Sequence, residues 1–131
     1  MAEIADTHSY PSEWLKQEDH LGLYSREDIT ILAGVGVPYV LLSGMVLGKI
    51  TASGKWVQLA PAAADGSEAA AGILFLDATA PVGTDKRAVA IARFALVSDN
   101  GLKWPVGITQ PQIATATSQL KALGIVTREG A

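Results

Sequence analysis

The sequence contains no cysteine. Disulfide bonds, thiolate nucleophiles and cysteine-ligated metal sites are therefore excluded, and any extra stability must come from packing or oligomerisation. Charged residues are also scarce: they make up 18% of the chain, below the roughly 25% that is usual in soluble proteins. A surface poor in charge favours cover by partner proteins, because exposed apolar patches tend to mark interaction sites. A high alanine content explains the same composition equally well.

Long apolar segments and targeting signals are absent as well. No apolar run approaches the roughly 20 residues of a membrane-spanning helix. Residues 1–6 lack the basic and apolar regions of a signal peptide. We therefore expect no membrane partner. We also expect a protein that stays in a cytoplasm-like compartment or is released by a route other than secretion.

Side chains that perform chemistry are few. The two histidines, His8 and His20, lie in the N-terminal part of the chain without the spacing that supports a metal site. No Gly-x-Ser-x-Gly motif is present to hold a nucleophilic serine. The aspartates after residue 60 stand at turn-like positions, where aspartate normally bonds nearby backbone. The sequence thus predicts no catalytic residue, no metal, no cofactor and no enzymatic activity.

Charge is distributed unevenly along the chain. Residues 1–28 carry seven acidic and two basic side chains, a net charge of −5, while the remainder carries six acidic and eight basic ones, a net charge of +2. An acidic segment on a nearly neutral body does not favour nucleic acid, which rewards clustered lysine and arginine. It favours a solvated tail or an arm that contacts another protein, so no direct nucleic-acid contact is expected.

Residues 1–28 read as an extended N-terminal arm. Polar and turn residues occur throughout, and residues 12–17 allow one or two helical turns at most. A disordered terminus is one interpretation. However, disordered segments are poor in aromatic residues, and this one contains Tyr10, Trp14 and Tyr24. We therefore favour an arm that becomes ordered when a partner binds it, attached to a body formed by residues 29–131.

The body is organised around residues 69–77, an almost wholly apolar run with turn residues on both sides. Such a run predicts a strand that is covered on both faces. Residues 45–51 and 55–59 predict a hairpin around Gly54, and residues 29–33 predict a further strand. Residues 86–97 alternate with apolar side chains on both faces and predict one long strand, in which Arg93 is the exception.

One helix is predicted near the C-terminus. Thr109 and Gln112 form the pattern of a capping box, and apolar residues then recur at helical spacing up to Leu123. Gly124 is the expected residue after the helix, and residues 125–127 predict a short closing strand. The fold class predicted is mixed β-rich (α+β): a small compact barrel- or sandwich-like body with one short C-terminal helix and an extended N-terminal arm.

A series of short matches in a fixed order is distinctive. It begins with a strand from Gly44 to Gly48 and continues with Trp-Val-Gln-Leu at 56–59 and an alanine-rich loop. Ala-Ala-Gly-Ile-Leu at 70–74, Arg-Phe-Ala-Leu-Val at 93–97 and Leu-Lys-Trp-Pro at 102–105 follow, and a short helix ends in Leu-Gly-Ile. The series resembles the head decoration protein family of lambda-like tailed bacteriophages, over about residues 29–127. The departure from that family lies in the acidic arm.

The resemblance implies a structural virion protein without catalysis or cofactor. It implies a homotrimer that binds major capsid protein on the outer surface of the expanded head at three-fold positions, and stabilises the head against packaged DNA. It also implies an arm that adds a strand to capsid segments, which is how extended peptides commonly dock. We expect capsid contacts at Tyr10, Trp14, Leu23, Tyr24, Ile29 and Ile31. Arg93 and Trp104 are expected at a subunit interface.

A second hypothesis comes from another class of protein. A soluble β-barrel module that binds a small ligand or carbohydrate would present a concave pocket lined by Trp56 or Trp104 with convergent polar groups. Indoles packed into the core would argue against it. The two hypotheses therefore predict different positions for the same side chains.

Overall fold

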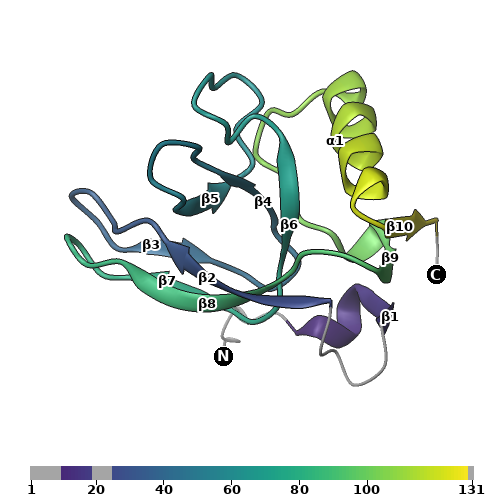
Figure 1. Cartoon of the computed structure of the whole chain (residues 1–131), viewed down its shortest axis with the longest axis horizontal. Helices are drawn as coiled ribbons and strands as arrows, with labels where there is room; N and C mark the ends of the chain where they lie inside the picture. Colours follow the sequence, from purple (N-terminus) through teal and green to yellow (C-terminus); the bar gives the residue numbers. More distant parts are fainter. Residues whose placement is uncertain (1–9, 19–24, 130–131) are drawn as a thin grey trace, which may run out of the picture.

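The structure is a computed structural model that describes residues 10–18 and 25–129. Figure 1 shows a β-barrel with a second, smaller sheet and the helix packed at one end and a two-stranded ribbon at the other. In chain order the elements are η1 (Pro11–Glu13), β1 (Leu15–Glu18), β2 (Arg26–Ile31), β3 (Tyr39–Leu41), β4 (Val46–Lys49), β5 (Trp56–Gln58), β6 (Ala70–Leu74), β7 (Ala78–Ala80), β8 (Lys86–Ile91), β9 (Ala95–Ser98), η3 (Asp99–Gly101), α1 (Gln110–Ala122) and β10 (Ile125–Arg128).

Five strands close the barrel in the order β2-β5-β4-β6-β8. β2 and β8 pair antiparallel over six residues each, from Arg26 opposite Ile91 to Ile31 opposite Lys86. β4 and β5 form the predicted hairpin, with Gly54 in a left-handed conformation (φ 74°) between them. The β-rich class with one C-terminal helix is therefore confirmed.

The predicted central run forms β6, and its two faces serve two cores. Leu74 packs inside the barrel with Ile31 and Trp56. Ile73 points the other way, into a second core shared with α1 and β9, where it meets Leu120. Both Ile73 and Leu74 are fully buried. β6 is thus the shared wall between the two cores, which explains why its sequence is apolar on both faces.

The C-terminal helix follows its predicted signals. The Thr109 hydroxyl accepts the Gln112 N–H and the Gln112 side chain accepts the Thr109 N–H, so both halves of the capping box form. Gly124 ends the helix with φ 84°, a conformation that favours glycine. β10 then runs parallel to β9. The helix start, the helix end and the closing strand are all confirmed.

The single long strand expected over residues 86–97 is wrong. The chain forms β8 in the barrel, bends, and forms β9 in a separate three-stranded sheet of order β1-β9-β10. At the bend Phe94 has φ 52°, and it is the one non-glycine residue of the described chain with a positive φ. The alternating pattern continues across the bend because β8 packs into both cores, through Ala90 and Ile91, while β9 packs into the second core. Apolar periodicity alone does not reveal such a change of sheet.

The boundary expected at residue 28 falls inside β2, which begins at Arg26. The helical turns expected over residues 12–17 are replaced by one 3-10 turn, η1, followed by the strand β1. β1 pairs antiparallel with β9, from Leu15 opposite Val97 to Glu18 opposite Ala95, with a bulge in between. Pairing with the edge of β9 supplies backbone hydrogen bonds that a short isolated helix cannot match. Residues 10–18 are accordingly packed against the body.

Candidate functional site

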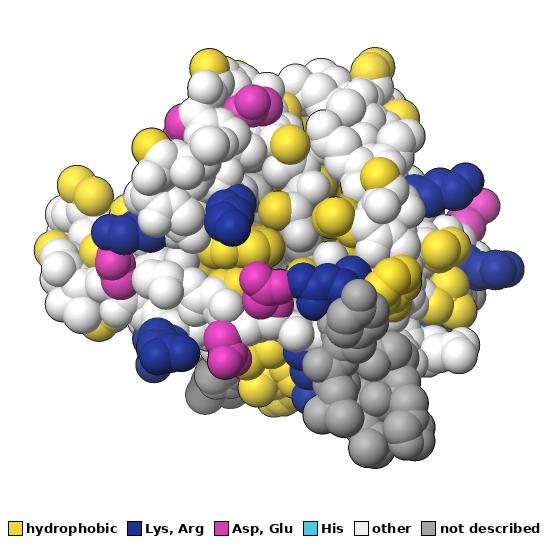
Figure 2. All heavy atoms as spheres, in the orientation of Figure 1, with side chains coloured by type: hydrophobic (Ala, Val, Ile, Leu, Met, Phe, Trp, Pro, Cys, Tyr) yellow, Lys and Arg dark blue, Asp and Glu magenta, His cyan; other side chains and the backbone are white. Residues whose placement is uncertain are grey.

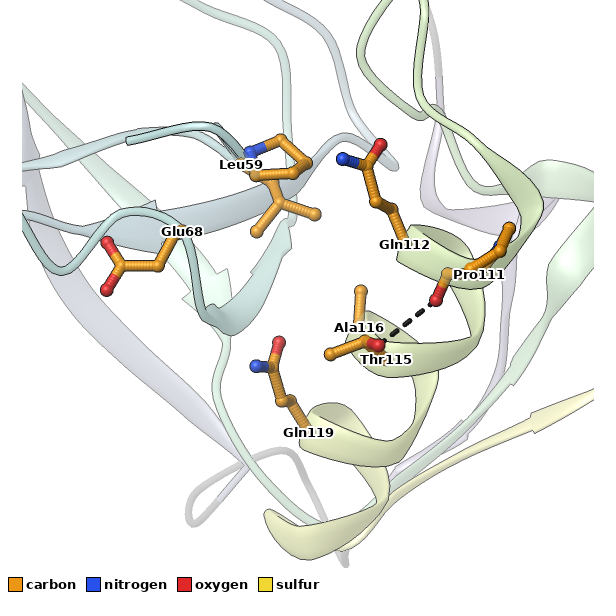
Figure 3. A pocket seen from close by; sticks show the side chains of 8 residues that line it. Leu59, Glu68, Pro111, Gln112, Thr115, Ala116 and Gln119 are labelled. Atoms are coloured by element: carbon orange, nitrogen blue, oxygen red, sulfur yellow. Dashed lines mark hydrogen bonds between the residues drawn. The ribbon is translucent and has the colours of Figure 1, made fainter. Parts of the chain in front are cut away.

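Hollows on the surface offer the first candidates for a small-molecule site. Figure 3 shows one between α1 and the loops around β6, in which Gln112 and Gln119 project from the helix toward the loops. The Gln119 side-chain oxygen accepts the Ala70 N–H at 2.8 Å, and the Glu68 carboxylate accepts the Gly66 N–H at 2.8 Å. These polar groups serve the protein's own backbone. The lining residues are Leu59, Pro61, Glu68, Pro111, Gln112, Thr115, Ala116 and Gln119.

The two tryptophans of the ligand-binding hypothesis lie outside the hollows described above and below. Trp56 is buried inside the barrel. Trp104 is half-buried and packs against the second core. Neither indole lines the hollow beside α1, the groove beside β3 or the groove beside β9. This placement argues against the soluble ligand-binding module. Among the residues that the structure describes, no cluster of three or more His, Cys, Asp or Glu side chains is placed to hold a metal ion.

Trp14, expected in a capsid-binding arm, is fully buried in the second core. Its indole N–H donates to the Ser43 hydroxyl at 2.9 Å, and that hydroxyl donates to the Phe75 carbonyl at 2.6 Å. Gly44 and Gly101 border Trp14 so closely that a Cβ added to Gly44 would lie 2.9 Å from the indole Cδ1, and one added to Gly101 would lie 2.7 Å from the Trp14 Cβ. Two glycines and a serine thus form a fitted slot for this side chain.

The far end of β1 is also fixed to the body. Arg26 donates two hydrogen bonds to one Glu18 oxygen, at 2.6 Å and 3.1 Å, and Ser25 donates to the other Glu18 oxygen at 3.1 Å. The Arg26 guanidinium also lies 4.1 Å from the centre of the Phe75 ring, a cation–π contact. Residues 10–18 are therefore held by Trp14 at one end and by Glu18 at the other.

The other expected capsid contacts have different positions. Ile29 and Ile31 lie in the barrel core, 4% and 0% exposed. Tyr10 is exposed. Leu23 and Tyr24 lie outside the described residues, as do His8 and His20. A capsid contact through Ile29 or Ile31 would require β2 to leave the barrel, so Tyr10 is the better placed of the three.

The two residues expected at a subunit interface are both partly buried. Arg93 forms an ion pair with Glu27, whose β2 strand lies beside β8. This pair spans the bend between β8 and β9 and fits the salt-bridge role that a lone arginine usually has. Trp104 leaves only part of its indole at the surface. Neither position tests a subunit contact, which stays a prediction.

Sequence reasoning missed an apolar patch at the end of the β3-β7 ribbon, which we call the valine tip. Two loops meet there through backbone hydrogen bonds from Gly34 to Pro81 and from Gly83 to Gly34, both 3.0 Å. Figure 1 shows these loops at the end of the molecule opposite β9 and β10. A groove beside the tip is lined by residues 32–35, 37–39 and 57. The side chains of the tip are more than half exposed: Val35, Val37, Val40 and Val82. Valines inside a glycine-rich turn were the available signal.

Two of the charged groups next to the valine tip form an ion pair. Asp85 accepts the Ala33 N–H at 2.9 Å and forms an ion pair with Lys55 at 2.9 Å. The hydrogen bond from Lys55 is the main reason that the pKa of Asp85 lies below its usual value. The tip therefore combines an apolar surface with an ion pair beside it.

The lowered pKa makes this edge sensitive to acid. Asp85→Asn is expected to lower the melting temperature at neutral pH, because the stabilisation from a depressed carboxyl pKa is present above the unfolded-state value near 3.8. The difference from the wild type should vanish as the pH falls through the folded-state pKa of Asp85. Calorimetry across that range measures it, with Asp28→Asn as a control at an exposed carboxylate of β2. A difference that persists at the acid end would contradict the assigned cause.

A second unexpected patch covers the outer side of the β1-β9-β10 sheet, and we call it the Phe94 face. By strand register Gln17, Leu96 and Val126 lie side by side across the three strands. Phe94 and Val126 are 49% and 40% exposed. Figure 2 shows hydrophobic side chains at this end of the molecule with basic side chains around them. The groove here is lined by Gln17, Glu18, Phe94, Ala95, Leu96, Val126 and Arg128. No local signal in the sequence marks Phe94, because it stands inside an unbroken alternating pattern.

Comparison with known proteins identifies the class to which this arrangement belongs. The family described as the bacteriophage lambda head decoration protein D matches residues 5–125, nearly the whole chain. A search of curated proteins finds no match. Within the described residues, none of the helices has the length and apolar character to cross a membrane. The match includes Trp14, the barrel, the helix, the valine tip and Phe94, and it ends before Val126 and Arg128. The chain therefore belongs to the lambda head decoration protein D family of phage head structural proteins.

Proposed function

We propose that this protein is a cement for the phage head: a homotrimer that binds the outer surface of the expanded capsid at three-fold positions and holds neighbouring major capsid subunits together against the pressure of packaged DNA. The family match over residues 5–125 carries the proposal. The protein acts by binding, without a cofactor, and it contacts neither the DNA nor a membrane.

Two exposed apolar surfaces at opposite ends of the molecule support this function. The valine tip and the Phe94 face are separated along the long axis (Figure 1). Exposed apolar patches rimmed by polar residues tend to mark protein interaction sites. A cement protein must contact both its own copies and the shell, and two separate surfaces allow both contacts at once.

Trimer formation would make modest contacts effective. Once one copy is bound, the others are held at a high effective concentration near their own sites, so overall affinity rises without any new contact. The N-terminal segment would add to this binding through Tyr10 and the residues before it, together with Leu23 and Tyr24. Such an arm adds backbone hydrogen bonds to those of the body.

The direct experiment is co-sedimentation of the purified protein with expanded heads of its own phage. Bound protein is expected at three copies per three-fold position, and decorated heads should keep their DNA at temperatures that open undecorated ones. Unexpanded heads are the matched control, and light scattering gives the mass of the free protein. Failure to sediment with expanded heads, or decoration without any gain in heat resistance, would refute the proposal.

A further inference from the structure

We propose that Asn100, followed by Gly101, is a site of spontaneous covalent modification: its side-chain amide is lost as ammonia, and the isoaspartyl product loosens the docking of residues 10–18. Asn100 is the one asparagine of the sequence. Asparagine is among the thermolabile residue types, and a glycine after it places no side chain in the way of the reaction. The reaction does not depend on what the protein binds, so it stands apart from the proposed function.

The modification needs only the chain itself and water. The Gly101 backbone nitrogen attacks the Asn100 Cγ: a bond forms between these two atoms, the bond from Cγ to the side-chain nitrogen breaks, and the Gly101 amide proton leaves with that nitrogen as ammonia. Water then opens the succinimide ring at one of its two carbonyls. Opening at one carbonyl gives aspartate, and opening at the other gives isoaspartate, whose backbone is one methylene longer. Ammonia is exchanged for water, without oxidation or reduction.

The structure leaves Asn100 accessible to this reaction. It is exposed in the short 3-10 turn η3, and its side chain forms no hydrogen bond with the part of the chain that the structure describes. The turn is closed by the Leu102 N–H, which donates to the Asp99 carbonyl at 3.4 Å, longer than is usual for such a bond. A weakly closed turn at the surface opens readily, and opening lets the amide carbon reach the Gly101 nitrogen.

The chain contains one comparable pair, Asp65-Gly66, and there hydrogen bonds oppose the same chemistry. Asp65 Oδ1 accepts the Ser67 hydroxyl at 2.6 Å and the Ser67 N–H at 3.0 Å. These bonds hold the pKa of Asp65 below its usual value, so the carboxylate stays charged and is a poor target for attack. The Gly66 N–H, which would attack, donates to Glu68 at 2.8 Å. No described residue restrains the Asn100 side chain in this way.

An isoaspartyl residue at position 100 would lengthen the backbone where it packs against the N-terminal segment. A Cβ added to Gly101 would lie 2.1 Å from the Glu13 carbonyl oxygen and 2.7 Å from the Trp14 Cβ. These contacts require glycine at 101, which is also what makes the preceding asparagine reactive. Because the Gly101 backbone already fills its space, an extra methylene before it displaces these contacts and weakens the docking of residues 10–18.

The experiment incubates the full-length protein in mildly alkaline buffer and follows it by intact mass and peptide mapping. The wild type is expected to exchange an amide NH₂ for OH at Asn100, with isoaspartate detected by labelling with an isoaspartyl methyltransferase. Asn100→Gln is the matched control, because its longer side chain does not close the same ring. The rate of amide loss in this variant should be lower by a factor of about ten or more.

Melting temperatures separate the longer backbone from the added charge. The isoaspartyl form, isolated by chromatography, is expected to melt about 5 °C or more below the untreated protein, which is a modest loss of packing for a domain of this size. Asn100→Asp adds the charge at an exposed position without lengthening the backbone, so it should melt as the wild type does. Hydrogen exchange at the β9 amides paired with β1 should rise only in the isoaspartyl form.

The outcomes support or overturn the assignment as follows. If the folded wild type keeps its mass under conditions in which the urea-unfolded chain loses ammonia, the turn protects the site and the assignment is wrong. If the isoaspartyl form and Asn100→Asp melt alike, the longer backbone does not disturb the docked segment. Isomerisation of Asp65 ahead of any change at Asn100 would overturn the comparison of the two turns. Amide loss at Asn100 in the folded protein, with a lower melting temperature for the isoaspartyl form alone, supports the assignment.

Discussion

Trp14→Ala is expected to lower the free energy of unfolding by about 3–5 kcal/mol, as removal of a buried aromatic side chain typically does. For a domain of this size that corresponds to a fall in melting temperature of about 10–20 °C. The indole is fully buried and is bonded to Ser43. Because Gly44 borders the ring and Gly101 borders the Trp14 Cβ, both without a side chain, the slot has little side chain with which to fill the space. The loss of stability therefore has two parts: the indole no longer buries apolar surface, and a cavity remains in its place.

Graded replacements show which part of the contact matters. Trp14→Phe keeps most of the apolar volume and loses the bond to Ser43, whose hydroxyl retains its bond to Phe75. It should therefore lie between the wild type and Trp14→Ala in thermal or urea unfolding. Tyr10→Ala is the matched control, since Tyr10 is exposed and close in sequence, and surface changes usually stay within about 0.5 kcal/mol. Equal effects of Trp14→Ala and Tyr10→Ala would show that residues 10–18 are not docked.

Removal of residues 1–9 is expected to leave the melting temperature unchanged, whereas removal of residues 1–18 is expected to lower it. The chain 10–131 keeps η1 and β1 with their contacts to the body and should melt as the full protein does. The chain 19–131 loses Trp14 and the whole of β1, so it should lose more than Trp14→Ala does, and the β9 backbone becomes an unpaired edge. Exposed edges promote aggregation. Circular dichroism and hydrogen exchange at β9 amides measure both effects.

Truncation at residue 28 tests the division into arm and body directly. The sequence alone predicts that deletion of residues 1–28 leaves a folded body. The structure instead predicts that this deletion also removes Arg26, Glu27 and Asp28 from their pairing with β8. It should therefore unfold more readily than the chain 19–131. A cooperative transition of 29–131 near that of the full protein would reinstate the boundary at residue 28. The chain 10–131 then measures what residues 1–9 contribute to head binding.

Much of the body follows from local patterns. The apolar run that becomes β6, the β4-β5 hairpin and the capped helix ending at Gly124 are predictable, because each depends on turn chemistry or on periodicity within about a dozen residues. The family resemblance is available in the same way, as an ordered series of short motifs. The absence of cysteine excludes disulfides and cysteine-ligated metals by composition alone. These features determine the class of protein and its β-rich fold.

Only the tertiary structure decided where the chain changes sheet and which surfaces it leaves exposed. The sequence from 86 to 97 alternates without a break, yet it divides between two sheets at Phe94, and the outward turn of that ring depends on Gly124, which is distant in the chain. Trp14 looked like an exposed anchor because its slot is made by Ser43, Gly44 and Gly101, which are distant in sequence. Local patterns indicate which residues are buried. Contacts between segments that are distant in sequence decide in which core each of them is buried.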